Sequence, residues 1–245
     1  MHYPIIMLLL IASTPILSRE TSYVADAFGY LPANQCSYDY LNIDAQAIPL
    51  SLVAAGSDPA NDEGAAVIDL PAAFFYYDED HTQLVVSSNG YLAFESDLAR
   101  ENGADFGNDC PFPSIPDNQP QSLKRIMPFH DDMIGSPSGQ IQWAHYINCP
   151  LAAYDSACTV IEWDNWQIAD QADVFSFQVI LVHQPAVIVM QFNDQTPTAN
   201  SASVGFQHAG LFSGQVLSCN QSDVTLNSQA FCFQNDLIFT NGFEQ

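Results

Sequence analysis

The chain has 245 residues, of which 48% are hydrophobic and 13% are charged. Acidic residues outnumber basic ones by 28 to 4, which gives a formal net charge of −24 at pH 7. Nucleic acids and anionic membrane surfaces both need a basic partner, so this composition excludes them as ligands. The apolar fraction is too high for a disordered chain, and the length suits one globular domain.

The beginning of the chain predicts an export signal. An apolar run from Ile5 to Leu17 is too short to cross a bilayer comfortably and lies where the hydrophobic part of a secretory signal belongs. Small residues place cleavage after Ser18, so that the signal spans residues 1–18, or after Ala27. The alternatives are an uncleaved amphipathic strand and a membrane anchor. We expect a secreted protein, extracellular or periplasmic and open to association with the cell envelope, without a membrane span after cleavage.

The even number of cysteines, six, predicts three disulfides in an exported chain. Two pairs of cysteines flank short loops between strand-like runs and are expected to bond locally, which leaves the two remaining cysteines for each other. The expected set is Cys36–Cys110, Cys149–Cys158 and Cys219–Cys232. Six cysteines allow 15 pairings, so other connectivities stay open.

Short β-forming runs separated by turn residues recur from residue 47 onward. The expected strands are 47–53, 65–77, 83–87, 91–95, 125–133, 140–148, 159–168, 174–183, 186–193, 201–208 and 214–219. Asn89-Gly90, between two of these runs, predicts a tight hairpin. Such spacing is typical of an antiparallel sandwich or barrel. We expect an all-β, jelly-roll-like antiparallel sandwich that forms one domain over residues 28–235, followed by a C-terminal tail at 236–245.

One long connection interrupts this pattern, at about residues 96–124. It is rich in Asp, Asn, Pro and Gly, which predicts an extended surface loop. Long loops are where binding residues concentrate, so this segment is a candidate location for function.

Acidic residues near predicted turns are the candidate metal ligands. Hard oxygen ligands in loops suit Ca²⁺, and the candidates are Asp62, Glu63, Asp131 and Asp132. Neighbours in a strand point to opposite faces, so Asp131 and Asp132 are not expected to converge by themselves. Ordinary solvated acidic loops are the alternative. Ca²⁺ is therefore a candidate ligand, and no cofactor is required by any motif.

Known catalytic motifs give no candidate catalytic residue. The chain has no G-x-S-x-G elbow, no H-E-x-x-H and no phosphate-binding glycine loop. Two carboxylates that act on a glycosidic bond leave no local motif, so a glycan-active hydrolase stays open as an alternative. Strand alternation places Trp163 and Trp166 on opposite faces, one in the core and one available to stack on a sugar or a partner. The other interpretation is that both rings are covered.

The order of several runs resembles a known family. FFYY, LVVSSNGYLAF, RIMPFHDDM, TVIEWDNW and FSFQVIL follow one another as in the nidogen-like sandwich domains of bacterial secreted proteins, over roughly residues 62–210. His130 stands where relatives usually carry Trp, and Tyr77-Asp78 where they carry Gly. The resemblance implies an extracellular β-sandwich that serves adhesion or interaction, without an agreed catalytic site.

These observations together predict a secreted, non-catalytic adhesion or interaction module. Its expected partner is an extracellular protein or a glycan. The alternatives are a glycan-active hydrolase on a sandwich scaffold and a Ca²⁺-stabilised structural protein of an envelope or matrix.

Overall fold

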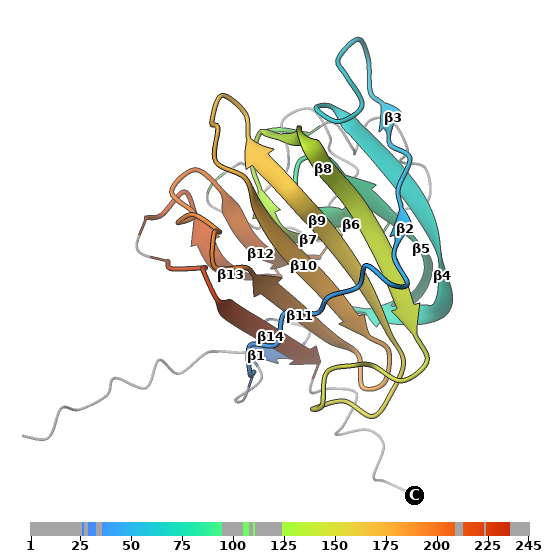
Figure 1. Cartoon of the computed structure of the whole chain (residues 1–245). Coiled ribbons are helices and arrows are strands. Elements are labelled where there is room, and N and C mark those ends of the chain that lie inside the picture. The colour runs from blue at the N-terminus through green and yellow to red at the C-terminus, as the bar shows by residue number, and fades with distance from the viewer. Residues whose placement is uncertain are drawn as a thin grey trace, which may run out of the picture.

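Two antiparallel sheets of seven strands each pack face to face in the computed structural model of the protein (Figure 1). The predicted antiparallel β-sandwich, built as a single domain, is confirmed. The structure describes residues 26, 29–32, 36–94, 105–107, 110, 124–208, 213–222 and 224–235. The predicted signal and the predicted tail lie outside these residues. Within them the chain forms no helix that is long and apolar enough to cross a membrane.

Each sheet has two edge strands, with five strands between them. The first sheet has the order β1 (Tyr30–Pro32), β14 (Gln229–Asn235), β11 (Val187–Phe192), β10 (Phe175–Val182), β9 (Cys158–Ile168), β8 (Met133–Tyr146) and β2 (Ile48–Pro49). The second sheet has the order β13 (Gly214–Cys219), β12 (Ser203–Gln207), β7 (Arg125–His130), β6 (Leu92–Ala93), β5 (Glu79–Ser87), β4 (Gly64–Tyr76) and β3 (Val53–Ala54). Most neighbours in the sheets are also neighbours in sequence, as hairpin connections require.

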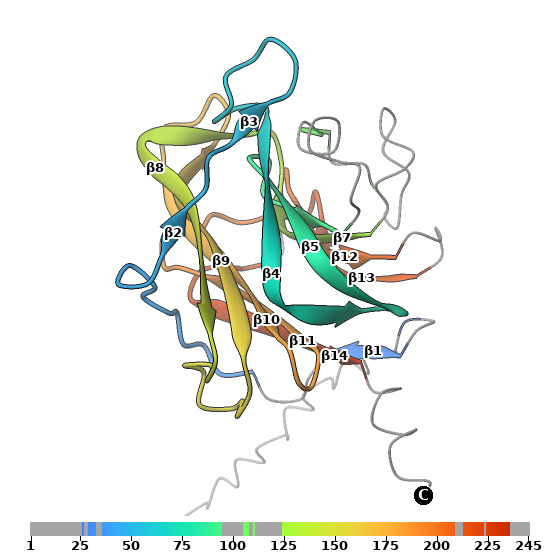
Figure 2. The ribbon, with the colours of Figure 1, turned by 90° about the vertical axis from the view of Figure 1, so that its right-hand side faces the viewer.

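Two of the expected strands are divided between the sheets. The expected strand at 47–53 becomes β2 and β3, and Figure 2 shows the chain passing there from one sheet edge to the other. Pro49 lacks an amide hydrogen, which is tolerated at the edge position of β2. The expected strand at 125–133 ends with β7, and β8 begins in the other sheet after residues 131–132.

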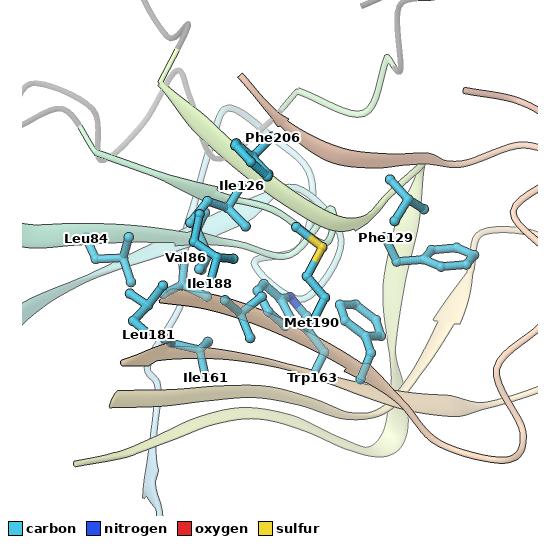
Figure 3. Packing of buried hydrophobic residues seen from close by; sticks show 14 of the residues in the cluster. Leu84, Val86, Ile126, Phe129, Ile161, Trp163, Leu181, Ile188, Met190 and Phe206 are labelled. Carbon is cyan, nitrogen blue, oxygen red and sulfur yellow. The ribbon is translucent and has the colours of Figure 1, made fainter. Parts of the chain in front are cut away.

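Side chains from both sheets meet in one apolar core (Figure 3). The labelled members are Leu84, Val86, Ile126, Phe129 and Phe206 from the second sheet and Ile161, Trp163, Leu181, Ile188 and Met190 from the first. All of them are almost completely buried. Each large apolar side chain buried in this way contributes about 2 kcal/mol, so the core is the main source of the stability of the sandwich.

A segment that we call the N-terminal strap, residues 36–47, covers the outer face of the first sheet. Leu41 of the strap belongs to a second apolar cluster on that face, and β10 is buried along its whole length. The side-chain amide of Gln178 binds the backbone N–H and C=O of Leu41, at 3.2 and 2.6 Å. Gln191 binds the backbone of Asp39 in the same way, at 2.8 Å for both bonds. The two glutamine side chains thus supply hydrogen bonds to the backbone of the strap, where no strand pairs with it.

The prediction that Trp163 and Trp166 lie on opposite faces is wrong, since both are buried in the core between the sheets. Trp163 pairs with Phe177 and Trp166 with Phe175, so β9 has one residue more than β10 over this stretch. Asn165 has a φ of 51°, as expected for the extra residue of a β-bulge. The bulge turns the second ring back into the core, and the interpretation that both rings are covered is confirmed.

Of the three predicted disulfide pairings, one is confirmed and two are wrong. The bonds join Cys36 to Cys232, Cys110 to Cys219 and Cys149 to Cys158. The local Cys149–Cys158 pair, between β8 and β9, is confirmed. The predicted Cys219–Cys232 pair is wrong because β13 and β14 belong to different sheets, although they are consecutive in the chain. The predicted Cys36–Cys110 pair is wrong for the same reason, since each of these cysteines bonds to a different sheet.

Candidate metal centre

Three of the four predicted calcium ligands converge at one end of the sandwich. Asp62 and Glu63 are the last residues of the β3–β4 loop. Asp132 lies in the connection from β7 to β8, and β8 begins at the same end of the sandwich as this loop (Figure 2). One carboxylate oxygen of each residue lies within 4.8 Å of one oxygen of each of the others. We call these three residues the carboxylate cluster. Two segments about 70 residues apart in the chain supply a set of hard oxygen ligands that suits Ca²⁺.

Asn89 positions the carboxylate cluster from the β5–β6 hairpin. Its side-chain NH₂ donates to Oε2 of Glu63 at 3.0 Å, and its Oδ1 accepts the backbone N–H of Met133 at 2.9 Å. Asn89 is completely buried. One amide therefore holds Glu63 in place and fixes the start of β8, immediately after Asp132.

Gly90 lets this hairpin approach the neighbouring strand closely. Its φ of 73° is a conformation that favours glycine, and an added Cβ would lie 1.9 Å from the carbonyl oxygen of Phe129. The predicted hairpin is confirmed, since Val86 of β5 pairs with Leu92 of β6. The Asn-Gly pair thus both makes the turn and carries the residue that orients the cluster.

Two further contacts of this hairpin fix the β3–β4 loop and the core below it. The Ser88 hydroxyl accepts the N–H of Gly64 at 3.0 Å and donates to the carbonyl of Asp62. The indole N–H groups of Trp163 and Trp166 donate to the carbonyls of Ser87 and Ser88, both at 2.8 Å. The carboxylate cluster therefore rests on a hairpin that is hydrogen-bonded both to the β3–β4 loop and to the core tryptophans.

The electrostatics of the carboxylate cluster favour a cation. Burial, together with the nearby carboxylates of Asp62 and Asp132, raises the pKa of Glu63 to about 7, although the hydrogen bond from Asn89 acts in the opposite direction. Burial also raises the pKa of Asp62 and of Asp132. Within the described part of the chain, the lysine and arginine side chains pair elsewhere, Lys124 with Glu79 and Arg125 with Asp105. A bound divalent cation would supply the positive charge that these carboxylates lack.

Asp131, the fourth predicted ligand, faces away from the carboxylate cluster. Its Oδ2 accepts the hydroxyl of Ser201 at 2.6 Å, and its Oδ1 accepts the N–H of Asp132 at 3.0 Å. It is buried, which raises its pKa. The expectation that Asp131 and Asp132 diverge is confirmed, and Asp131 stabilises the connection between the sheets.

His130, beside these aspartates, anchors part of the long loop predicted at 96–124. Its Nε2 lies 2.9 Å from the carbonyl oxygen of Asp105, and burial lowers its pKa to about 4. Arg125 lies over the Tyr91 ring at 4.4 Å and donates to the Asp105 carboxylate at 2.5 Å. These contacts hold residues 105–107 against the second sheet. The rest of that loop, apart from Cys110 and Lys124, lies outside the described residues.

The site depends on two residues that no metal-binding pattern in the sequence points to, Asn89 and Ser88. Both belong to the SSNG turn, whose sequence predicts a hairpin and gives no sign of a side-chain role. Their contacts with Asp62 and Glu63 bridge about 26 residues of chain. Only a prediction of which strands pair could have found them.

The family model described as NIDO related matches residues 33–239. No curated protein and no solved structure matches the chain. The matched residues span the strap, every strand of both sheets except β1, and the carboxylate cluster, and the two-sheet fold agrees with the nidogen-like resemblance. The chain belongs to the NIDO-related family.

Proposed function

We propose that this protein is a secreted, non-catalytic module that binds an extracellular protein or a glycan. The observation that carries the proposal is the NIDO-related match over residues 33–239. The three disulfides support an oxidising, extracellular location, because such bonds form and persist there.

The placement of the most suggestive polar residues supports a scaffold role over catalysis. His130 and Asp131 are buried and hold the connections around β7 through the bonds described above. Glu162 is buried on the outer face of the first sheet, where it accepts hydrogen bonds from Gln142 at 2.7 Å and Gln178 at 3.0 Å. Each of these groups already has protein partners that satisfy it.

A binding screen with the oxidised secreted protein tests this function. The protein is applied to a glycan array and to a panel of purified extracellular proteins, and each bound ligand is recovered and analysed by mass spectrometry. We expect saturable binding to a ligand that is recovered chemically unchanged. Release of a shortened glycan or peptide would contradict the proposal and favour the hydrolase.

We also propose that the carboxylate cluster binds Ca²⁺ and stabilises this end of the sandwich. The convergence of Asp62, Glu63 and Asp132 on the Asn89 support is the observation in favour. A cation that binds only the folded state raises its stability by about 2.7 kcal/mol at a hundredfold excess over Kd. We therefore expect the melting midpoint to rise by about 5 °C or more on replacing EDTA with Ca²⁺. An unchanged midpoint would overturn the calcium proposal and leave the interaction role standing.

A further inference from the structure

A concave region lies at the opposite end of the sandwich from the carboxylate cluster (Figure 2). It has a volume of about 990 Å³, within the range of ligand-binding pockets. Three segments line it: the bend and hairpin of β4 and β5, the loop from β8 to β9, and the hairpin from β10 to β11. We call this region the hairpin pocket. The Cys149–Cys158 disulfide closes the loop that forms one of its walls.

The charged groups of the hairpin pocket are two exposed aspartates. Asp80 enters from β5 and Asp155 from the β8–β9 loop. Neither takes part in an ion pair with another described residue. Two carboxylates in a concave site, on a chain of net charge −24, create a negative potential that attracts cations.

The surroundings of His183, which lines the hairpin pocket, favour its neutral form. The carbonyl of Ala73 lies 3.0 Å from Nδ1, which must carry the hydrogen because a carbonyl oxygen only accepts. Nε2 lies 3.0 Å from the hydroxyl of Thr159, which donates to it when the ring is neutral. Burial lowers the pKa of His183 as well. The histidine therefore adds no positive charge that would oppose a bound cation.

Phe75 adds an aromatic surface next to one of the carboxylates. It is half-buried, lines the hairpin pocket and pairs directly with Asp80 across the β4–β5 ladder. Side chains at directly paired positions lie on the same face of a sheet. An aromatic ring beside a carboxylate suits a guanidinium group, which stacks on the ring and donates to the carboxylate.

We propose that the hairpin pocket binds a basic side chain of a protein partner, with arginine preferred over lysine. This inference rests on the proposed interaction function and specifies which chemical group the partner presents. Asp80 and Asp155 would accept the guanidinium hydrogens, and Phe75 would contact its planar face.

The test uses isotope-labelled, oxidised full-length secreted protein and nuclear magnetic resonance. The probe is a capped pentapeptide with one central arginine, compared with the same peptide carrying lysine, or citrulline, the uncharged isostere of arginine. We expect the arginine peptide to shift the backbone amide signals of Ala73 and Ser156 saturably. The lysine peptide should bind more weakly, and the citrulline peptide about tenfold more weakly than arginine, because its charge is lost.

Matched variants show whether the two carboxylates are responsible. Asp80→Asn and Asp155→Asn should each weaken binding of the arginine peptide about threefold or more. Asp173→Asn removes an equal charge from an exposed loop outside the hairpin pocket and should leave the affinity unchanged. Equal loss in all three variants would show nonspecific attraction and overturn the proposal.

The remaining outcomes separate this inference from the function on which it rests. Equal affinities for the citrulline and arginine peptides would overturn the cation proposal. A glycan probe, chitotriose, gives a second check: if it shifts the amide signals of the hairpin pocket and the arginine peptide does not, the cation proposal is also overturned. A partner captured through another surface, with no shift from the arginine peptide, would remove this inference alone. Pocket binding of arginine together with turnover of a recovered ligand would contradict the non-catalytic function and keep the pocket assignment.

Discussion

At the scale of single residues, Asn89 holds the carboxylate cluster together, because its side-chain amide binds both Glu63 and the N–H of Met133 at the start of β8. Acidic residues beside predicted turns single out Asp62, Glu63, Asp131 and Asp132, and the structure brings together three of these four, without Asp131. Asn89 escapes such reasoning because its bond to Glu63 joins residues 26 positions apart, one in the β5–β6 turn and the other in the β3–β4 loop. Sequence patterns describe neighbours along the chain, and this contact depends on strand pairing.

Glu63 gives the apo protein a characteristic pH dependence. Burial raises its pKa in the folded state from the usual 4.5 to about 7. Between these values the folded state binds more protons than the unfolded state, so the free energy of unfolding falls as pH rises. In EDTA, we expect the melting midpoint of Glu63→Gln to fall less than that of the unmodified protein over this range.

The comparison between these two proteins isolates Glu63 from other titrating groups. His130 acts in the opposite direction, because its depressed pKa makes stability fall as pH drops from 6.5 towards 4. This contribution is common to both proteins. Parallel midpoint curves for the unmodified protein and Glu63→Gln would contradict the assignment.

Asn89 should be among the most sensitive polar residues of the fold. Asn89→Ala leaves Glu63 Oε2 and the Met133 N–H buried without a partner, at a cost of about 3 kcal/mol. Urea denaturation measures this loss. The control, Asn200→Ala, changes an exposed asparagine and should stay within about 0.5 kcal/mol. Similar losses for both variants would show that Asn89 does not anchor the site.

At the scale of elements, local patterns predict most strands but miss features that depend on the rest of the sheet. Alternation and the Asn89-Gly90 turn predict β5, β6 and most of the longer strands. The patterns do not predict the bulge in β9, because Asn165 occurs in a run that alternates like any other strand. The patterns also miss β14, which is defined by its pairing with β11, and the three-residue β1, which is defined by its pairing with β14.

The β9 bulge gives a test of backbone conformation. Asn165 has a φ of 51°, where a β-branched side chain costs about 1–2 kcal/mol more than glycine. Asn165→Val and Asn165→Gly both lose the side-chain bond to Asp164, so their difference isolates the backbone term. We expect chemical denaturation to show Asn165→Val as the less stable variant. The reverse order would be inconsistent with the bulge.

At the scale of the whole molecule, the sequence predicts the number of disulfides better than their connectivity. Spacing along the chain favours local pairs, and this succeeds for Cys149–Cys158. It fails for Cys219 and Cys232 because β13 and β14 follow one another in the chain but lie in different sheets. Assignment of strands to sheets is a global property of the sandwich that no local run encodes.

The observed disulfide pairing predicts an order of stability losses. Cys36–Cys232 joins residues 196 positions apart, and Cys149–Cys158 joins residues nine apart. If chain entropy dominates, the long-range bond contributes about 5 kcal/mol and the local one about 3 kcal/mol. Paired Cys→Ser variants compared in urea should show the larger loss for the long-range bond. The opposite order would contradict this connectivity.

Calorimetric titration of Ca²⁺ into the oxidised protein tests most directly whether the carboxylate cluster is a metal centre. Three proteins are compared: the unmodified chain, Asp132→Asn and Asp131→Asn, whose altered residue faces Ser201 instead of the cluster. We predict one site in the unmodified protein, unchanged affinity in Asp131→Asn and a loss of about tenfold or more in Asp132→Asn, since affinity follows ligand charge. Absence of binding to the unmodified protein, or equal loss in both variants, would contradict the account.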